Sequence, residues 1–384
     1  MRTKSGILFH AQNGTGLGHI RRVSLLCSEL LSQRSSLQVS VITNAQHTPF
    51  LNNLPVKVIK LPKDSISEES YPDSMKKNNN FFISILQNQK PRVLIFDTIF
   101  DPDLALYAQS IGIKTVIVQR MIQPSILLER IAGGFYNFFD LIIFPHPQES
   151  IGRAWKKIKD SSIGEKVFAD GFVTDTNQRL LKSSPVDFEL VASLGGGGPY
   201  FINIDGVRYL RDHSALTEQI METISSLSPK SNHGKFCFSL GLNNRNRFNS
   251  NNIQNQTFGH VQITSWINDF PAVIKHCQLC ISRCGYNTVC EIINARCPCI
   301  LIPRKCRTES QRAHATWLEE QGAAIVVDED DPDLCNKLKK IWYDDEMLYN
   351  MRTAISKISI QSGTAIIVHR FLSLYDEGRK YKCE

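Results

Sequence analysis

Three segments of the chain combine residue types that could bind an anion or move a proton. The first, residues 13–22 (NGTGLGHIRR), follows a short apolar run. Glycines let backbone N–H groups approach a ligand, and the start of the following helix attracts negative charge. A titratable His19 at that helix start is a candidate acid or base. The residues expected to contact a ligand such as a diphosphate here are Gly14, Thr15, Gly16, Gly18 and Arg22.

The second segment is Leu194–Pro199 (LGGGGP), again at the end of an apolar run. Four consecutive glycines are costly in backbone entropy and rarely serve packing alone. We interpret them as a cradle of amides for a pyrophosphate. The Lys-Ser/Thr ending of a P-loop is absent, and the first glycine loop lacks the spacing and the acidic residue of a dinucleotide-binding fingerprint. Neither ATP hydrolysis nor NAD binding is therefore expected.

The third segment is residues 281–321, which contains RCGYNTVCE and a later ESQRAH stretch. An expected strand at 278–282 ends at Arg283, and a helix begins near Thr288. Thr288 and nearby amides could meet a phosphate, while Glu291, one turn later, could accept hydrogen bonds from a ribose diol. The alternative is that Glu291 is a helix residue paired with Arg283. Beyond the next strand, Arg304 could supply polar contacts.

Asp97 ends a further apolar run, VLIFD, and is a second candidate general base. Its alternative role is to cap the helix that follows, since Pro102 and Asp103 come shortly after. Phe135, Phe138 and Phe139 are favoured as buried core, with contact to a lipid or another hydrophobic ligand as the alternative.

Apolar periodicity defines the elements that must position these residues. Short continuous apolar runs alternate with amphipathic stretches, a pattern typical of parallel strands covered by helices on both faces. The expected strands are at residues 7–11, 38–44, 55–61, 93–96, 115–118, 141–144, 190–194, 235–240, 261–264, 278–282, 295–303 and 323–327. The polar stretch 64–80 predicts a surface loop, with a lid as the less favoured alternative. The pattern loosens after residue 161, so we place a domain boundary near residue 175.

Composition limits the classes of function. The chain has 384 residues, 42% of them hydrophobic, and Lys plus Arg exceed Asp plus Glu by 44 − 37 = 7. The basic excess is spread along the chain without a dense stripe, which indicates an anionic small ligand or a membrane surface rather than nucleic acid. Eleven cysteines without a secretion signal predict free thiols in a reducing, cytoplasmic setting. Cys277, Cys280 and Cys284 are expected to be buried and not to bind zinc.

The third segment, together with GLGHIRR, the DTIF stretch at 97–100 and the GGGG loop, resembles the MurG-like glycosyltransferases of family 28. It is most similar to a bacterial group of predicted glycosyltransferases with GLGHIRR and GYNTVCE motifs. The resemblance spans most of the chain. It implies an α/β fold of the GT-B type: two Rossmann-like, doubly wound parallel-sheet domains with the active site in the cleft between them. The implied domains are an acceptor-binding domain, 1–175, and a donor-binding domain, 176–362. A C-terminal helix at about 363–384 would pack back on the first.

The resemblance also implies a function: inverting, metal-independent transfer of a sugar from a nucleotide-diphosphate sugar, UDP-GlcNAc-like, to a small-molecule or lipid-linked acceptor. No cofactor is expected. His19 and Asp97 are the candidate catalytic residues. The donor-binding residues carried over or predicted are Gly195, Gly196, Gly197, Gly198, Arg283, Gly285, Asn287, Thr288, Glu291, Arg304, Glu309, Gln311 and His314. The alternatives are a nucleotide-sugar hydrolase or hydrolysing epimerase of the same fold, and a non-catalytic nucleotide-sugar-binding protein. The chain departs from the family at Pro199–Tyr200 and at His314.

Overall fold

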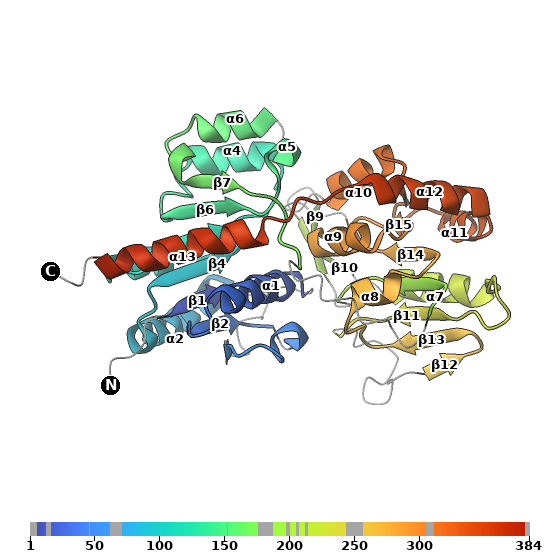
Figure 1. The fold of residues 1–384 in the computed structure, drawn as a ribbon, viewed down its shortest axis with the longest axis horizontal. Coiled ribbons are helices and arrows are strands. Elements are labelled where there is room, and N and C mark those ends of the chain that lie inside the picture. The colour runs from blue at the N-terminus through green and yellow to red at the C-terminus, as the bar shows by residue number, and fades with distance from the viewer. Residues whose placement is uncertain are drawn as a thin grey trace. The chain divides into compact units, whose positions relative to one another are not determined.

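The computed structural model describes residues 6–12, 17–45, 47–61, 71–120, 122–151, 153–175, 187–196, 200–204, 207–211, 214–242, 256–304 and 311–380. The chain divides into two compact units (Figure 1). One is built mainly from His19–Thr176 together with Gln361–Glu384, and the other mainly from Asn177–Ile360.

The first unit contains a seven-stranded sheet in which every neighbouring pair is parallel. Its strands, in spatial order, are β3 (Lys57–Lys60), β2 (Val39–Thr43), β1 (Ile7–His10), β4 (Val93–Asp97), β5 (Lys114–Val118), β6 (Leu141–Phe144) and β7 (Val167–Ala169). Its helices are α1 (Gly18–Gln33), η1 (Pro49–Leu51), α2 (Tyr71–Gln89), α3 (Pro102–Ser110), α4 (Pro124–Ala132), α5 (Gln148–Ile151), α6 (Arg153–Lys159), η3 (Gly164–Lys166) and α13 (Thr364–Lys380).

Both faces of this sheet are buried under helices. Successive strand residues point to opposite faces, so each strand contributes to both apolar layers. Ile7 and Phe9 of β1 pack with apolar residues of α1 and α13, whereas Leu8 packs with residues of α2 and α3. Helix α13 is therefore part of the first core. Phe371 is fully buried there, with its ring centroid 6.3 Å from that of Phe9.

Two further contacts tie the C-terminal segment to the first unit. Thr364 Oγ1 accepts a hydrogen bond from Thr174 N at 2.9 Å and donates one to Thr174 O at 2.7 Å. Arg370 binds Asp170 through two nitrogen–oxygen contacts of 2.6 and 2.8 Å. The last helix of the chain thus packs on the sheet that the first strand helps to build.

The loop prediction for residues 64–80 is wrong for 71–80, which form the first half of α2. Residues 64–70 lie outside the described part of the chain. The helix is held by its second half, where Phe82, Ile85 and Leu86 recur at helical spacing and are buried. Pro72 lies in the first turn, where a missing N–H costs no helical hydrogen bond. The polar stretch therefore continues an amphipathic helix toward its N-terminus.

The second unit contains another seven-stranded sheet, parallel except for one edge strand. Its strands, in spatial order, are β12 (Gln256–Phe258), β13 (Val261–Thr264), β11 (Phe236–Ser239), β8 (Leu190–Ser193), β14 (Leu279–Ser282), β15 (Cys299–Leu301) and β16 (Ala324–Val326). A separate hairpin pairs β9 (Tyr200–Ile204) with β10 (Val207–Arg211). The helices are α7 (Ser214–Ser226), α8 (Phe270–Ile274), α9 (Tyr286–Ala295), α10 (Gln311–Glu320), α11 (Leu334–Trp342) and α12 (Asp345–Lys357).

This second sheet also lies between two apolar layers. Leu190 and Ala192 of β8 face a core with α7 and α11, and Val191 faces a core with α9 and α10. Two doubly wound α/β units are thus present, as the periodicity predicts. Among the described residues, every helix is too short or too polar to cross a lipid bilayer.

Candidate functional site

The strand order of the first sheet reverses at one place, between β1 and β4. From β1 the chain runs through α1 to β2 on one side, and from β4 it runs through α3 to β5 on the other side. Ligands of doubly wound sheets bind at the carboxyl ends of strands where the order reverses in this way. Asp97 is the last residue of β4, and His19 lies in the first turn of α1, so both candidate catalytic residues stand at this point.

The structure brings His19, Asp97 and Arg22 into one buried network. Asp97 Oδ2 lies 2.7 Å from His19 Nδ1, and Asp97 Oδ1 accepts from Arg22 Nε at 2.8 Å. A second guanidinium nitrogen, Arg22 Nη2, lies 2.6 Å from the same Oδ1. His19 and Arg22 are three residues apart in α1, which places both on one helix face. The side chains of Arg22 and Asp97 are each only 1% exposed.

The charges in this network follow from the contacts. Burial would raise the pKa of Asp97, but Arg22 and His19 together hold the pKa of that carboxyl below its usual value. Burial lowers the pKa of His19, and the attraction of Asp97 offsets this only in part, with Arg120 and Arg22 lowering the pKa further. At neutral pH the pair is therefore a carboxylate and a neutral imidazole.

An ionised carboxylate can only accept hydrogen bonds, so the proton of the neutral imidazole is on Nδ1. The lone pair of His19 is then on Nε2. A neutral imidazole oriented by a carboxylate in this way is the arrangement of a general base. The geometry suits His19 to accept a proton and Asp97 to orient its ring. The alternative role of Asp97 as a helix cap does not apply to α3, whose N-cap is Asp101.

The remaining loop residues predicted in this unit are only partly visible. Gly18 is exposed at the first position of α1. Gly14, Thr15 and Gly16 lie outside the described residues. The three phenylalanines after α4 are in the core, as favoured: Phe139 is buried, and Phe135 and Phe138 pack against the same apolar cluster.

The second sheet has its own reversal of strand order, between β8 and β14. The loop after β8 leads away toward β11, and the loop after β14 leads through α9 to β15 on the opposite side. Gly195 follows β8 with φ +85°, and an added Cβ would meet only open space there. Gly196 is buried, while Gly197 and Gly198 are not among the described residues.

Helix α9 begins at this same edge of the second sheet. Gly285 is its N-cap and provides no side-chain hydrogen bond, and no acidic residue lies in the first turn. The first N–H groups of a helix have no partner within the helix, so they suit an anion. Asn287 and Thr288 lie in this first turn and Glu291 in the second, all half-buried. The predicted phosphate-binding residues thus share one helix start.

The side chain of Arg283, between β14 and α9, binds other groups of the second unit. Its Nη2 forms an ion pair with Glu329 Oε2 at 2.9 Å, and its Nη1 donates to the carbonyl of Ile302 at 3.1 Å. Both charged side chains are nearly buried, with 5% and 6% exposed. Arg283 therefore ties the loop before α9 to the segment after β16.

Some of the predicted donor-binding residues beyond β15 contact one another. Gln311, buried at the start of α10, accepts a hydrogen bond from Arg304 N at 3.1 Å through Oε1. His314, one turn along α10, stands edge-on to Tyr286 with ring centroids 6.5 Å apart. Glu309 is outside the described range. The first turns of α9 and α10 are thus linked through an aromatic contact.

Cys277, Cys280 and Cys284 are buried, as the sequence predicts, and so are Cys297 and Cys299. All five are thiols outside any disulfide in the described part of the chain. Burial raises the pKa of Cys297 to about 12. Among the described residues, no group of three or more His, Cys, Asp and Glu side chains could hold a metal ion.

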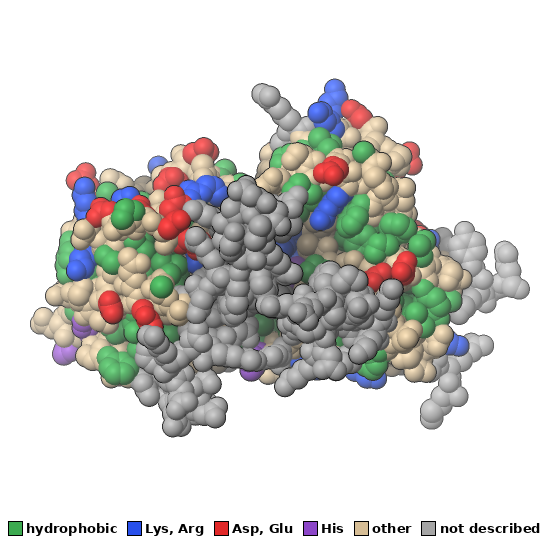
Figure 2. Space-filling view, turned by 180° about the vertical axis from the view of Figure 1, so that it is seen from behind, with side chains coloured by type: hydrophobic (Ala, Val, Ile, Leu, Met, Phe, Trp, Pro, Cys, Tyr) green, Lys and Arg blue, Asp and Glu red, His purple; other side chains and the backbone are tan. Residues whose placement is uncertain are grey.

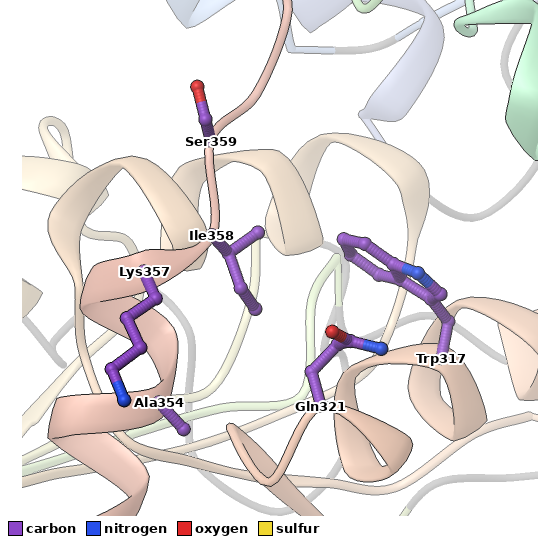
Figure 3. A pocket seen from close by; sticks show the side chains of 6 residues that line it. All are labelled: Trp317, Gln321, Ala354, Lys357, Ile358 and Ser359. Carbon is purple, nitrogen blue, oxygen red and sulfur yellow. The ribbon is translucent and has the colours of Figure 1, made fainter.

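A pocket elsewhere in the second unit contains none of the predicted site residues. It lies between the ends of α10 and α12, has a volume of about 370 Å³ and is lined by Trp317, Gln321, Ala354, Lys357, Ile358 and Ser359. In Figure 3, Trp317 and Gln321 line one side of the pocket and Ile358 and Lys357 the other. Figure 2 shows basic and acidic side chains interspersed over the described part of the visible face, in keeping with a basic excess spread along the chain.

Three residues with a role in these networks were missed by the sequence analysis. Thr98 follows Asp97, and its hydroxyl accepts from Arg22. His10 ends β1 and is buried, with its ring edge-on to the rings of Phe82 and Phe96. Glu329 lies within an acidic run, DEDD, that is typical of a solvated surface. His10 had a usable signal as a titratable residue at a strand's carboxyl end, and Thr98 had one as part of the DTIF stretch.

The fold defines the class of protein. The chain shares the GT-B fold with MurG of Acinetobacter baumannii, which it matches with a TM-score of 0.57 and 16% identity over 96% of this chain and 99% of that one. It also matches the glycosyltransferase of kitacinnamycin (TM-score 0.63, 13% identity, 96% and 98% covered). A UDP complex of Staphylococcus aureus MnaA has the same fold (TM-score 0.62, 12% identity, 99% and 98% covered).

The likeness to a sequence family lies in the second half of the chain. Residues 212–365 match the glycosyltransferase family 28 C-terminal domain. A relative from Natranaerobius thermophilus, UDP-N-acetylglucosamine--N-acetylmuramyl-(pentapeptide) pyrophosphoryl-undecaprenol N-acetylglucosamine transferase, is 34% identical over 28% of this chain and 30% of its own length. The enzyme of that name from Listeria monocytogenes is 24% identical over 59% and 61%. The chain thus spans from under a third to about three fifths of the length of these curated relatives. The family 28-like, MurG-like character predicted from the motifs is confirmed.

Proposed function

We propose that the chain is an inverting glycosyltransferase that moves a sugar from a nucleotide-diphosphate sugar, UDP-GlcNAc-like, to a small-molecule or lipid-linked acceptor. The observation that carries the proposal is the buried His19–Asp97 pair at the reversal point of the first sheet. The match to the family 28 C-terminal domain and the curated relatives support the donor class, because those relatives are named for transfer from UDP-N-acetylglucosamine to a pyrophosphoryl-undecaprenol acceptor.

In the proposed reaction, His19 Nε2 takes the proton of an acceptor hydroxyl or amine. The acceptor atom attacks the anomeric carbon on the face opposite the leaving group, and the bond to the nucleoside diphosphate breaks with inversion. Asp97 stabilises the imidazolium that forms, since their contact of 2.7 Å strengthens when the ring is charged. No metal is required in this scheme.

The leaving diphosphate needs charge stabilisation, which we assign to the second unit. The uncapped start of α9 offers N–H groups and a positive helix end, and Gly195 leaves open space for a close approach. Glu291 would bind the ribose, with Gln311 and His314 near the sugar. Because Arg283 is paired with Glu329, we assign it to holding the α9 loop in place.

Donor binding is tested by thermal unfolding with a panel of UDP-, GDP- and TDP-sugars. At 100 times its dissociation constant, a donor stabilises the protein by about 2.7 kcal/mol, which raises the melting temperature of a domain of this size by about 5–10 °C. A shift with UDP-sugars is expected. If no nucleotide sugar shifts the melting temperature, the proposed donor class is wrong.

Turnover distinguishes the three functions that share this fold. A transferase releases nucleoside diphosphate only with an acceptor, and a cell extract followed by mass spectrometry of the products identifies that acceptor. A hydrolase or epimerase releases free or isomerised sugar from the donor alone. A binding protein shows the thermal shift without any release.

A further inference from the structure

The turn that follows the catalytic carboxylate has an unusual backbone. Thr98, directly after β4, has a φ of +68°, and Ile99 N donates to the carbonyl of Asp97 at 2.8 Å. A hydrogen bond from residue i+2 to residue i around a positive φ is the classic γ-turn, which is rare and strained. Threonine is β-branched, so it is poorly suited to this region.

Hydrogen bonds on two sides hold Thr98 in this conformation. Its N–H donates to the carbonyl of Val118, at the end of β5, at 2.9 Å, and its hydroxyl donates to the same oxygen at 3.2 Å. On the other side, Arg22 Nη2 donates to Thr98 Oγ1 at 3.1 Å. The turn is therefore anchored to β5 and α1.

The contact with Arg22 connects this turn to the proton acceptor. Arg22 Nη2 lies 3.1 Å from the hydroxyl of Thr98 and 2.6 Å from Asp97 Oδ1. One guanidinium nitrogen thus bridges two neighbouring side chains of the turn. The other carboxylate oxygen, Oδ2, lies 2.7 Å from His19 Nδ1. A rotation of the carboxylate would break the contact with His19, and the bridge opposes it.

Glycine would adopt this φ at lower cost, but it has no hydroxyl. Strained residues persist where the surrounding structure over-determines them, and they cluster at functional sites. We infer that Thr98 is a positioning residue: its strained turn and its hydroxyl hold Arg22 and Asp97 in the one arrangement that directs the His19 Nδ1 proton to Asp97. This inference rests on the proposed role of His19 as the base.

The expected change in His19 follows from the groups that act on it. Asp97 raises the pKa of His19, whereas burial, Arg120 and Arg22 lower it, and His10 is a further titratable neighbour. Without the Thr98 hydroxyl, the carboxylate is less well fixed and its attraction weakens. The pKa of His19 then falls further, and the neutral ring is no longer held with its proton on Nδ1.

The test uses the full chain labelled with ¹⁵N and ¹³C histidine, with His19 assigned by its loss in His19→Gln. In wild type, His19 is expected to be neutral at pH 7 with the proton on Nδ1. Thr98→Val removes the hydroxyl but keeps the β-branch, and should lower the pKa by up to about one unit and mix the two tautomers. Thr98→Ser should restore the wild-type spectrum.

Two further variants separate positioning from a general structural effect. Thr43→Val is the matched control, since Thr43 ends β2 and its hydroxyl only accepts from Ala45 N at 3.0 Å. It should leave the His19 signals unchanged. Thr98→Gly relieves the strained φ, so it should fold well and yet show the mixed tautomers of Thr98→Val. Wild-type His19 signals in both Thr98→Val and Thr98→Gly would overturn the inference.

Sugar transfer provides the second readout. Thr98→Val is expected to lower kcat about tenfold, the effect of one lost hydrogen bond to a charged group, with the KM for the donor unchanged. If KM rises and kcat stays, Thr98 has no role in positioning the base. If wild type transfers no sugar at all, the proposed function fails, while the tautomer measurement still decides the role of Thr98.

Discussion

The buried charges of the first unit make the free energy of unfolding depend strongly on Asp97. In Asp97→Asn, Arg22 keeps its charge at 1% exposure but loses the carboxylate that contacts its Nε at 2.8 Å and its Nη2 at 2.6 Å. Breaking a buried pair by removing one partner costs about 3–5 kcal/mol, because the remaining charge is uncompensated. We expect Asp97→Asn to destabilise the first unit by that amount.

A matched control is available on the same unit. Asp376 forms a bidentate pair with Arg34, but their side chains are 40% and 32% exposed. Asp376→Asn should therefore cost no more than about 1 kcal/mol. In the double variant Arg22→Met/Asp97→Asn the unpaired charge is gone, and most of the lost stability should return.

The assay is native-state hydrogen exchange in urea, because two units can unfold at different urea concentrations and a single transition would mix them. Amides of β1 and β4 give the free energy of unfolding of the first unit. If Asp97→Asn costs as little as Asp376→Asn, Arg22 does not depend on the carboxylate, and the account of this network is wrong.

Three further predictions concern other parts of the structure. Burial lowers the pKa of His10 from 6.5 to about 4, so the unfolded chain takes up the proton first as the pH falls. Relative to His10→Gln, wild type should therefore lose about 3 kcal/mol of its free energy of unfolding between pH 6.5 and 4. If the free energies of unfolding of the two proteins change in parallel with pH, this prediction is wrong. Phe371→Ala leaves a cavity against Phe9 and should cost about 3–5 kcal/mol in urea unfolding; a cost under 1 kcal/mol would mean that α13 is not part of the first core. Glu329→Gln leaves Arg283 without its buried partner, so calorimetry should show weaker UDP binding, whereas unchanged affinity would separate this pair from the donor site.

Most strands of the two sheets could be predicted because they are short apolar runs, most of them buried on two faces, which the sequence displays directly. The three-residue edge strands β7 and β12 were not predicted. The first half of helix α2 was predicted as a loop because it is polar, while the buried residues Phe82, Ile85 and Leu86 lie in its second half. The hairpin of β9 and β10 was not among the predicted strands.

The candidate site could be predicted only as far as local signals reach. His19 and Asp97 each stand at the end of a recognisable pattern, so both were found, but their contact joins residues 78 apart in sequence. The positive φ of Thr98 and the pairing of Arg283 with Glu329 arise from the arrangement of several elements. Such long-range geometry leaves no mark on local composition.

The central claim is that His19 is the base of sugar transfer. It is tested most directly by measuring release of nucleoside diphosphate from a UDP-sugar, in the presence of the acceptor, for wild type, His19→Ala and the exposed control His47→Ala. We expect His19→Ala to lose at least about 100-fold in kcat, as removal of a general base does, while it still binds the donor and melts like wild type. His47→Ala should turn over normally. Wild-type turnover in His19→Ala would contradict the account.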